Sequence, residues 1–219
     1  MAVRMLVAQA SPLPPSEVSG AFLRAFDGGP CFLARAGAPG DAAGTIEAIG
    51  DDMTVFQRFQ VEYRKLVGNA PTANYKAISP PQCPALEVVK ATAPGGQHEP
   101  QVELARFEVG GGQPLAGTVS GLGRRRLVLL IVGEDGVIHH IPTTSTSAGD
   151  VASFSAQVGR VDDSSIGPLQ LLIAIVSDKP LPSVDGFRTG TIRELAPKLA
   201  AEWRDAGAAA RVELFQFKK

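Results

Sequence analysis

The sequence has almost no net charge and lacks any long apolar run. Lysine and arginine number 21 against 22 acidic residues, which gives a formal charge of −1 over 219 residues. This balance provides no overall electric field for collecting nucleic acid or an anionic membrane. The best apolar run, at residues 127–132, is far below the roughly 18 residues of a membrane-spanning helix. We therefore expect a chain that binds no nucleic acid and does not cross a bilayer.

Residues that could catalyse a reaction or bind a metal are few and scattered. His98, His139, His140, Cys31 and Cys83 form no CxxC, HxxxH or HExxH spacing. Consecutive strand residues point to opposite faces, so we expect His139 and His140 not to chelate one ion, with one exposed and the other packed. There is no Gly-x-Ser-x-Gly motif and no kinase motif. The sequence predicts a non-enzyme without a metal or another cofactor.

Glycine and proline are abundant. The 24 glycines and 17 prolines make up 41 of 219 residues, above the usual share of about 12%. They favour short strands separated by turns, and the glycine runs at 110–112 and 121–123 match no phosphate-binding loop. We expect an α+β protein in two parts, residues 16–92 and 101–219, after an extended, proline-containing lead-in over residues 1–15.

The first part is predicted to have the element order α-β-β-α-β. An apolar helical face covers residues 16–26 and ends at a glycine-proline turn. Residues 31–35 and 45–49 are typical of an antiparallel hairpin, and residues 75–78 and 86–89 of strand pieces interrupted by prolines. Two helices on one face of a three-stranded sheet would bury the apolar faces of both.

The helix after the hairpin has the clearest pattern. Asp51 or Asp52 can cap its start, and a glycine at position 68 can end it. Apolar residues recur at helical spacing opposite charged and amide residues, namely Phe56, Phe59, Tyr63, Leu66 and Val67. The spacing predicts that they form core, with an aromatic binding surface as the alternative.

The second part is predicted to be a mainly antiparallel β-sandwich with a C-terminal helix and strand. Six strand-like runs are separated by glycine turns, at residues 102–109, 114–120, 126–132, 137–141, 151–158 and 169–176. Residues 127–132 and 171–176 are apolar at every position, as in strands covered on both faces. Leu195, Leu199 and Trp203 form a helical face. Thr191 could cap it, but Pro197 would break a helix that started there, which moves the expected start toward residue 196.

The two cysteines can form a disulfide within the first part. Cys31 precedes one predicted strand and Cys83 another, and adjacent strands could bring their Cα atoms within the roughly 4.4–6.8 Å that a disulfide needs. Two unlinked buried thiols are the alternative. The bridge would indicate an oxidising, extracytoplasmic compartment.

One basic cluster occurs, at Arg124, Arg125 and Arg126, just before an apolar strand. Its side chains would splay onto alternate faces, which favours a solvated sheet edge that resists strand pairing. Contact with a partner is the other interpretation.

Several segments resemble a known family. The Gly-Gly-Pro-Cys turn at 28–31, the helix at 56–68 and the Pro-Gln-Cys-Pro motif at 81–84 are similar to the C-terminal extracytoplasmic region of alphaproteobacterial transmembrane serine/threonine kinases. The resemblance implies a BON-like domain, and residues 113–115 and 127–137 resemble the β-sandwich accessory domain that follows it. It implies a membrane anchor outside this chain and carries over no catalytic residue.

These observations predict a non-catalytic, periplasmic sensing or docking module of an envelope signalling protein. The partner would be an unknown envelope ligand or protein, near peptidoglycan or the membrane surface. A structural adaptor in an envelope or secretion assembly is the alternative hypothesis. A hydrolase with a serine or aspartate beside a histidine is a third.

Overall fold

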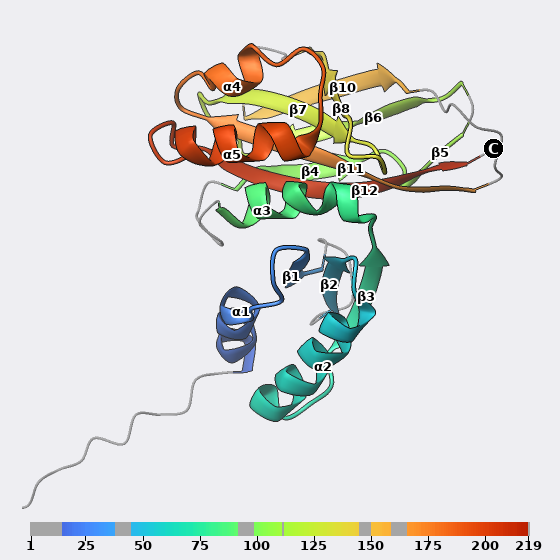
Figure 1. Ribbon diagram of the computed structural model, residues 1–219, viewed down its shortest axis with the longest axis vertical. Coiled ribbons are helices and arrows are strands. Elements are labelled where there is room, and N and C mark those ends of the chain that lie inside the picture. Colours follow the sequence, from blue (N-terminus) through green and yellow to red (C-terminus); the bar gives the residue numbers. More distant parts are fainter. Residues whose placement is uncertain are drawn as a thin grey trace, which may run out of the picture.

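The computed structural model describes residues 15–37, 45–91, 99–110, 112–144, 150–158 and 166–218. They form an α+β protein (Figure 1). The expected lead-in lies outside these residues except for Pro15, and so does most of the expected linker between the two parts. A small three-stranded sheet comes first, and two larger sheets that do not close into a barrel follow it. We call residues 15–77 the small-sheet unit and residues 101–218 the two-sheet unit.

The small-sheet unit contains the predicted hairpin. β1 (Phe32–Ala36) pairs antiparallel with β2 (Thr45–Gly50), and β2 pairs parallel with β3 (Thr72–Ala77). The chain crosses from β2 to β3 through α2 (Met53–Val67), because two parallel strands need such a crossover. The strand order β1-β2-β3 leaves β1 at one edge of the sheet.

An aromatic core holds α1 (Pro15–Ala25) and α2 on one face of this sheet. Phe59 has no exposed surface, and its ring centroid lies 5.2–6.3 Å from five other rings. These rings are Phe22, Phe26, Phe32, Phe56 and Tyr63. The prediction that the aromatic residues of α2 form core is confirmed for Phe56, Phe59 and Tyr63.

The ends of α2 follow the predicted caps, but its last turn departs from the predicted face. The Asp52 carboxylate accepts a hydrogen bond from the Thr54 N–H at 2.7 Å, and Gly68 ends the helix with φ 89°. The prediction that Leu66 is core was wrong, because its side chain is 58% exposed. At about 100° per residue, three positions after Tyr63 turn it about 60° off the buried stripe.

The predicted strand at residues 86–89 was also wrong, because these residues are helical. A short 3-10 turn, η1 (Pro80–Gln82), leads into α3 (Cys83–Ala91). The prolines at 80, 81 and 84 stand at the starts of these helices, where the missing N–H costs no intrahelical bond. The apolar run reads as a strand because α3 is buried over much of its surface, at Ala85, Leu86, Val88 and Val89.

The two-sheet unit pairs a four-stranded with a five-stranded sheet. The strand orders are β4-β6-β10-β9 and β5-β12-β11-β7-β8. Their bounds are β4 (Gln101–Leu104), β5 (Glu108–Gly110), β6 (Pro114–Ser120), β7 (Arg126–Val132), β8 (Ile138–Ile141), β9 (Thr143–Thr144), β10 (Val151–Gln157), β11 (Ile166–Ser177) and β12 (Ala209–Lys218). The run at 102–109, expected as one strand, divides into β4 and β5, which belong to different sheets. A shared apolar core packs the two sheets against each other.

The prediction that β7 and β11 are covered on both faces is confirmed. These strands pair at the centre of the five-stranded sheet, and residues 171–176 have no exposed surface. Leu172, Ala174 and Val176 face the four-stranded sheet. Leu171, Ile173 and Ile175 face a helical layer of α3, α4 (Pro182–Asp185) and α5 (Ile192–Glu202) (Figure 1).

The start of α5 corrects the expectation of a start near residue 196. The helix begins at Ile192 with the Thr191–Glu194 capping box and continues through Pro197. Burial of Leu195 and Leu199, neither of which has exposed surface, offsets the backbone hydrogen bond that proline removes.

Helix α3 joins the two units. It contacts β1 on one side and β12 and α5 on the other, and Figure 1 shows it between the small sheet and the five-stranded sheet. One apolar core contains Ile49 of β2 and Ile78, Leu86 of α3, and Leu214 of β12. The packing is therefore continuous from the small sheet through α3 into the two-sheet unit.

Candidate functional site: a groove between the two units

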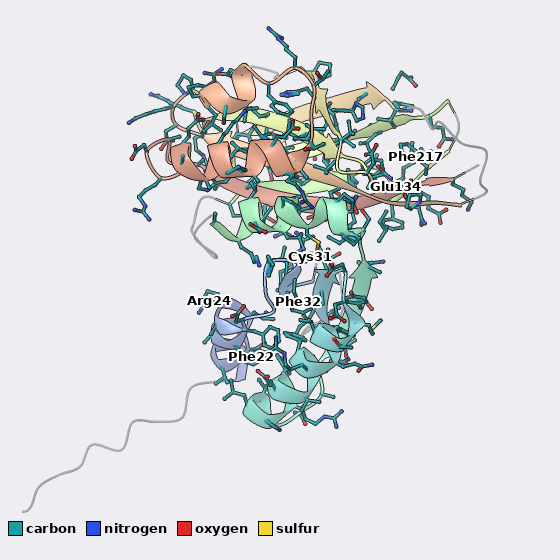
Figure 2. All side chains as sticks on the ribbon, in the orientation of Figure 1. Phe22, Arg24, Cys31, Phe32, Glu134 and Phe217 are labelled. Carbon is teal, nitrogen blue, oxygen red and sulfur yellow. A yellow bond between two sulfur atoms is a disulfide. The ribbon has the colours of Figure 1, made fainter. Side chains whose placement is uncertain are left out.

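The predicted disulfide is confirmed, but it joins different elements from those expected. Cys31 and Cys83 are bonded, with their Cα atoms 4.7 Å apart. Cys31 lies in the turn before β1, and Cys83 is the first residue of α3 and not part of a strand. Figure 2 shows Cys31 and its sulfur beneath α3. The bond therefore ties the small sheet to the helix that packs on the two-sheet unit.

Asp51 is the one carboxylate placed beside the disulfide among the described residues. Its Oδ2 lies 3.5 Å from Sγ of Cys83, and the three side chains have the spacing of a metal-ligand group. Thiolates, not disulfide sulfurs, bind metals, so this group cannot act as a metal site while the disulfide is formed.

The histidines predicted as possible site residues lie apart from this region. His139 and His140 are both exposed, so the expectation that one is packed was wrong. They stand on β8, an edge strand, where both side chains can reach solvent. His98 lies outside the described residues.

The three arginines at 124–126 do not act together. Arg125 donates hydrogen bonds to the carbonyls of Leu122 and Gly121 within its own turn. Arg126 forms an exposed ion pair with Asp185 at 3.5 Å, and Arg124 is exposed in the same turn. The structure therefore divides this basic cluster among three environments. Its contact with a partner stays a prediction.

A groove of about 470 Å³ lies where the two units meet. Sequence reasoning missed it. The groove is lined by α1, by β1, by the end of α3, and by residues at the starts of β4 and β12. The apolar lining includes Leu23 of α1 and Phe26 just after it on one side, and Val89 and Ala210 on the other. A volume of this size falls within the usual range for small-ligand sites.

Two arginines line the groove, and Arg35 bonds across the two units. Arg35 of β1 donates from Nε to Glu47 at 2.7 Å and from Nη2 to Glu213 of β12 at 3.0 Å. Arg211 binds the other oxygen of Glu213 at 2.9 Å and Glu99 at 3.2 Å. Burial alone would lower the pKa of Arg211, but the hydrogen bond and charge of Glu213, and then Glu99, raise it. These two arginines are thus already neutralised by carboxylates.

Two other cations of the groove have no carboxylate partner among the described residues. Lys90 donates to the carbonyl oxygen of Gly29 at 2.6 Å, and it forms no ion pair with a residue that the structure describes. Burial lowers the pKa of Lys90, against the raising effect of the Glu87 and Asp27 charges. Arg24 is exposed on α1 (Figure 2) and lines the same groove. The groove therefore offers an apolar surface with two cationic groups available to an anion.

No sequence signal could have located this groove, because its walls are far apart in the chain. Arg35 and Glu213 are separated by 178 residues, and their strands meet through long-range packing in which α3 contacts both.

No helix in the described parts of the chain has the length and apolarity needed to span a membrane. Comparisons with known proteins give no match, either to a family model, to a curated protein or to a solved structure.

Proposed function

We propose that this chain is a non-catalytic, extracytoplasmic docking module of an envelope signalling protein, and that the groove is where it binds. The single observation that supports this most directly is the groove of about 470 Å³ at a junction cross-linked by a disulfide. A disulfide is consistent with an oxidising compartment outside the cytoplasm.

The position of the groove supports a sensing role. Its lining comes from both units, so a bound molecule touches β1 and α1 on one side and α3 and β12 on the other. Binding at such a junction stabilises one relative arrangement of the units, because a ligand favours the conformation that it contacts best. The groove is thus a place where occupancy could alter a neighbouring domain.

The parent protein that we propose is a membrane serine/threonine kinase, on the strength of the resemblance at the Gly-Gly-Pro-Cys and Pro-Gln-Cys-Pro motifs. The chain would be its BON-like and β-sandwich sensor region. Binding would then change how two kinase molecules associate across the membrane.

The test uses immobilised, oxidised protein and an envelope extract separated into membrane, peptidoglycan and periplasmic protein fractions. Lys90→Glu reverses a charge in the groove, whereas Lys198→Glu makes the same change on the exposed side of α5, outside the groove. We expect one fraction to bind wild type and K198E but not K90E. Equal retention by all three proteins, or by none, would refute docking at this groove. A constitutive stoichiometric complex that ignores K90E would favour the structural adaptor.

A further inference from the structure

The outer edge of β1 forms one wall of the groove. Six consecutive residues, 32–37, line it. Side chains on one face of a strand alternate, so a cavity against a face would contact every second residue. Because the groove contacts every one of these six residues, it runs along the edge of the strand, where the backbone N–H and C=O groups lie.

The backbone groups on this edge can be identified from the pairing of β1 with β2. The Gly37 N–H donates to the Thr45 carbonyl at 2.8 Å, which makes Gly37 and Thr45 a hydrogen-bonded pair. Hydrogen-bonded and non-bonded pairs alternate in an antiparallel ladder. The N–H and C=O groups of Phe32, Ala34 and Ala36 therefore face away from β2 and into the groove, and no described strand pairs with them.

This edge lacks the protection that proteins usually give to an open strand. A charged side chain on an edge strand normally discourages pairing with another chain. The only charged residue of β1 is Arg35, whose guanidinium is bound to Glu47 and Glu213. The other residues of β1 are small or apolar, and they line the groove.

We propose that the groove binds an extended acidic peptide of a partner protein, which adds to the free edge of β1 as a fourth strand and places a carboxylate on Arg24 and Lys90. This deepens the proposed docking function and rests on it. Alternate peptide side chains would pack on Leu23 of α1, on Phe26 just after it, and on Val89 across the groove. Main-chain bonds along β1 supply affinity that is independent of sequence, and the two cations select for the acidic residue.

Charge favours a partner over the segments of this chain that the structure does not describe. Residues 1–14 and 92–98 contain no aspartate or glutamate, and residues 38–44 contain only Asp41. The first two segments therefore cannot supply the carboxylate that Arg24 and Lys90 lack. Lys90 has three ammonium donors, of which the Gly29 carbonyl uses one, so two are left for a ligand.

The direct test is backbone amide exchange measured by NMR, with the blocked peptide Val-Thr-Val-Glu-Val as probe. In the free protein, the amides of Phe32, Ala34 and Ala36 should exchange fast, while those of Leu33 and Arg35, bonded to β2, are protected. Saturating peptide should protect the first three and leave the other two unchanged. Protection of the three outward amides in the free protein would mean that the chain covers its own edge, and would overturn the proposal.

Two matched changes separate strand addition from simple charge attraction. N-methylation of alternate peptide amides, which removes the donors facing β1, should abolish binding. Replacing the peptide glutamate with glutamine should weaken binding about threefold to fivefold, as for an exposed ion pair.

In the protein, Ala34→Pro removes one outward N–H. It leaves the hydrogen bonds between β1 and β2 intact, since proline is tolerated on an edge strand in that orientation.

The outcome distinguishes this proposal from the docking function on which it rests. If envelope binding is sensitive to K90E but no peptide protects the outward amides, docking stands and strand addition is wrong. If the N-methylated peptide binds as well as its parent, strand addition is likewise wrong, whether or not Ala34→Pro folds.

Discussion

Reduction of the disulfide should weaken the small-sheet unit far more than the two-sheet unit. Cys31 and Cys83 are 52 residues apart, and the closed loop contains β1, β2, α2 and β3. The bridge removes conformational entropy from the unfolded loop. For a loop of this length, that raises the free energy of the unfolded loop by about 4 kcal/mol at 25 °C. The two-sheet unit lies outside the loop, so its own unfolding gains nothing directly from the bond.

The aromatic residues of the chain make this difference measurable. The two tyrosines, Tyr63 and Tyr75, are both in the small-sheet unit, and the single tryptophan, Trp203, is buried beside α5. Urea unfolding followed by tyrosine and by selectively excited tryptophan fluorescence therefore reports the two units separately. With a denaturant slope of about 2 kcal/mol per molar urea, a loss of about 4 kcal/mol moves the tyrosine midpoint by about 2 M.

We expect reduced protein, and equally the Cys31→Ser/Cys83→Ser double variant, to lose the tyrosine signal well before the tryptophan signal. The double variant controls for effects of the reductant. A tyrosine shift that corresponds to less than about 1 kcal/mol would contradict the loop-entropy argument. Equal shifts of both signals would show instead that the units unfold together and that the bond stabilises the whole chain.

Three further predictions concern the core, the junction and the groove. Phe59→Ala should cost about 3–5 kcal/mol of unfolding free energy because Phe59 is fully buried among five rings, whereas Leu66→Ala on the same helix should change it by less than about 0.5 kcal/mol. Arg35→Met should cost about 3 kcal/mol because it leaves the partly buried Glu47 without its cation and breaks the bond to Glu213, whereas Lys218→Gln, which removes an exposed ion pair, should cost less than about 1 kcal/mol. Urea unfolding tests both pairs, and similar losses within a pair would refute the reasoning. For Lys90, burial lowers the folded-state pKa, so the unfolded state binds more protons between that pKa and 10.5. The stability of wild type relative to Lys90→Met should therefore rise with pH across this window, and a flat difference would show that the lysine is solvated.

The elements that the sequence predicts well are those whose pattern is local. The apolar stretch of β11 indicates a strand covered on both faces, and the cap and helical spacing of α2 define that helix. The same reasoning fails at α3, where four buried residues within five positions are interrupted by Glu87 alone, which marks the helical period weakly. It also fails at the edge strand β8, where burial does not alternate and both His139 and His140 reach solvent.

The candidate site is beyond local reasoning for a different reason. Two cysteines in a chain allow one intramolecular pairing, so the disulfide could be predicted, although its location at α3 could not. Arg35 reads as an ordinary polar residue of a hairpin, because its hydrogen-bond partner Glu213 belongs to the last strand of the chain. The groove is formed by long-range packing, and the sequence contains no motif that indicates it.

The disulfide, the Arg35 ion pairs and the proposed strand addition all act on one structural junction, so their effects should be linked. A peptide whose main-chain bonds all fall on β1 raises the stability of the folded small-sheet unit by about 2.7 kcal/mol at a concentration one hundred times Kd. That is about two thirds of the roughly 4 kcal/mol that reduction of the disulfide removes. In reduced protein, saturating peptide should therefore reverse most of the decrease in the urea midpoint that tyrosine fluorescence reports. The midpoint that tryptophan fluorescence reports should stay nearly unchanged. A peptide that instead bound the two-sheet unit alone would shift the tryptophan signal, which would place its site outside the β1 edge.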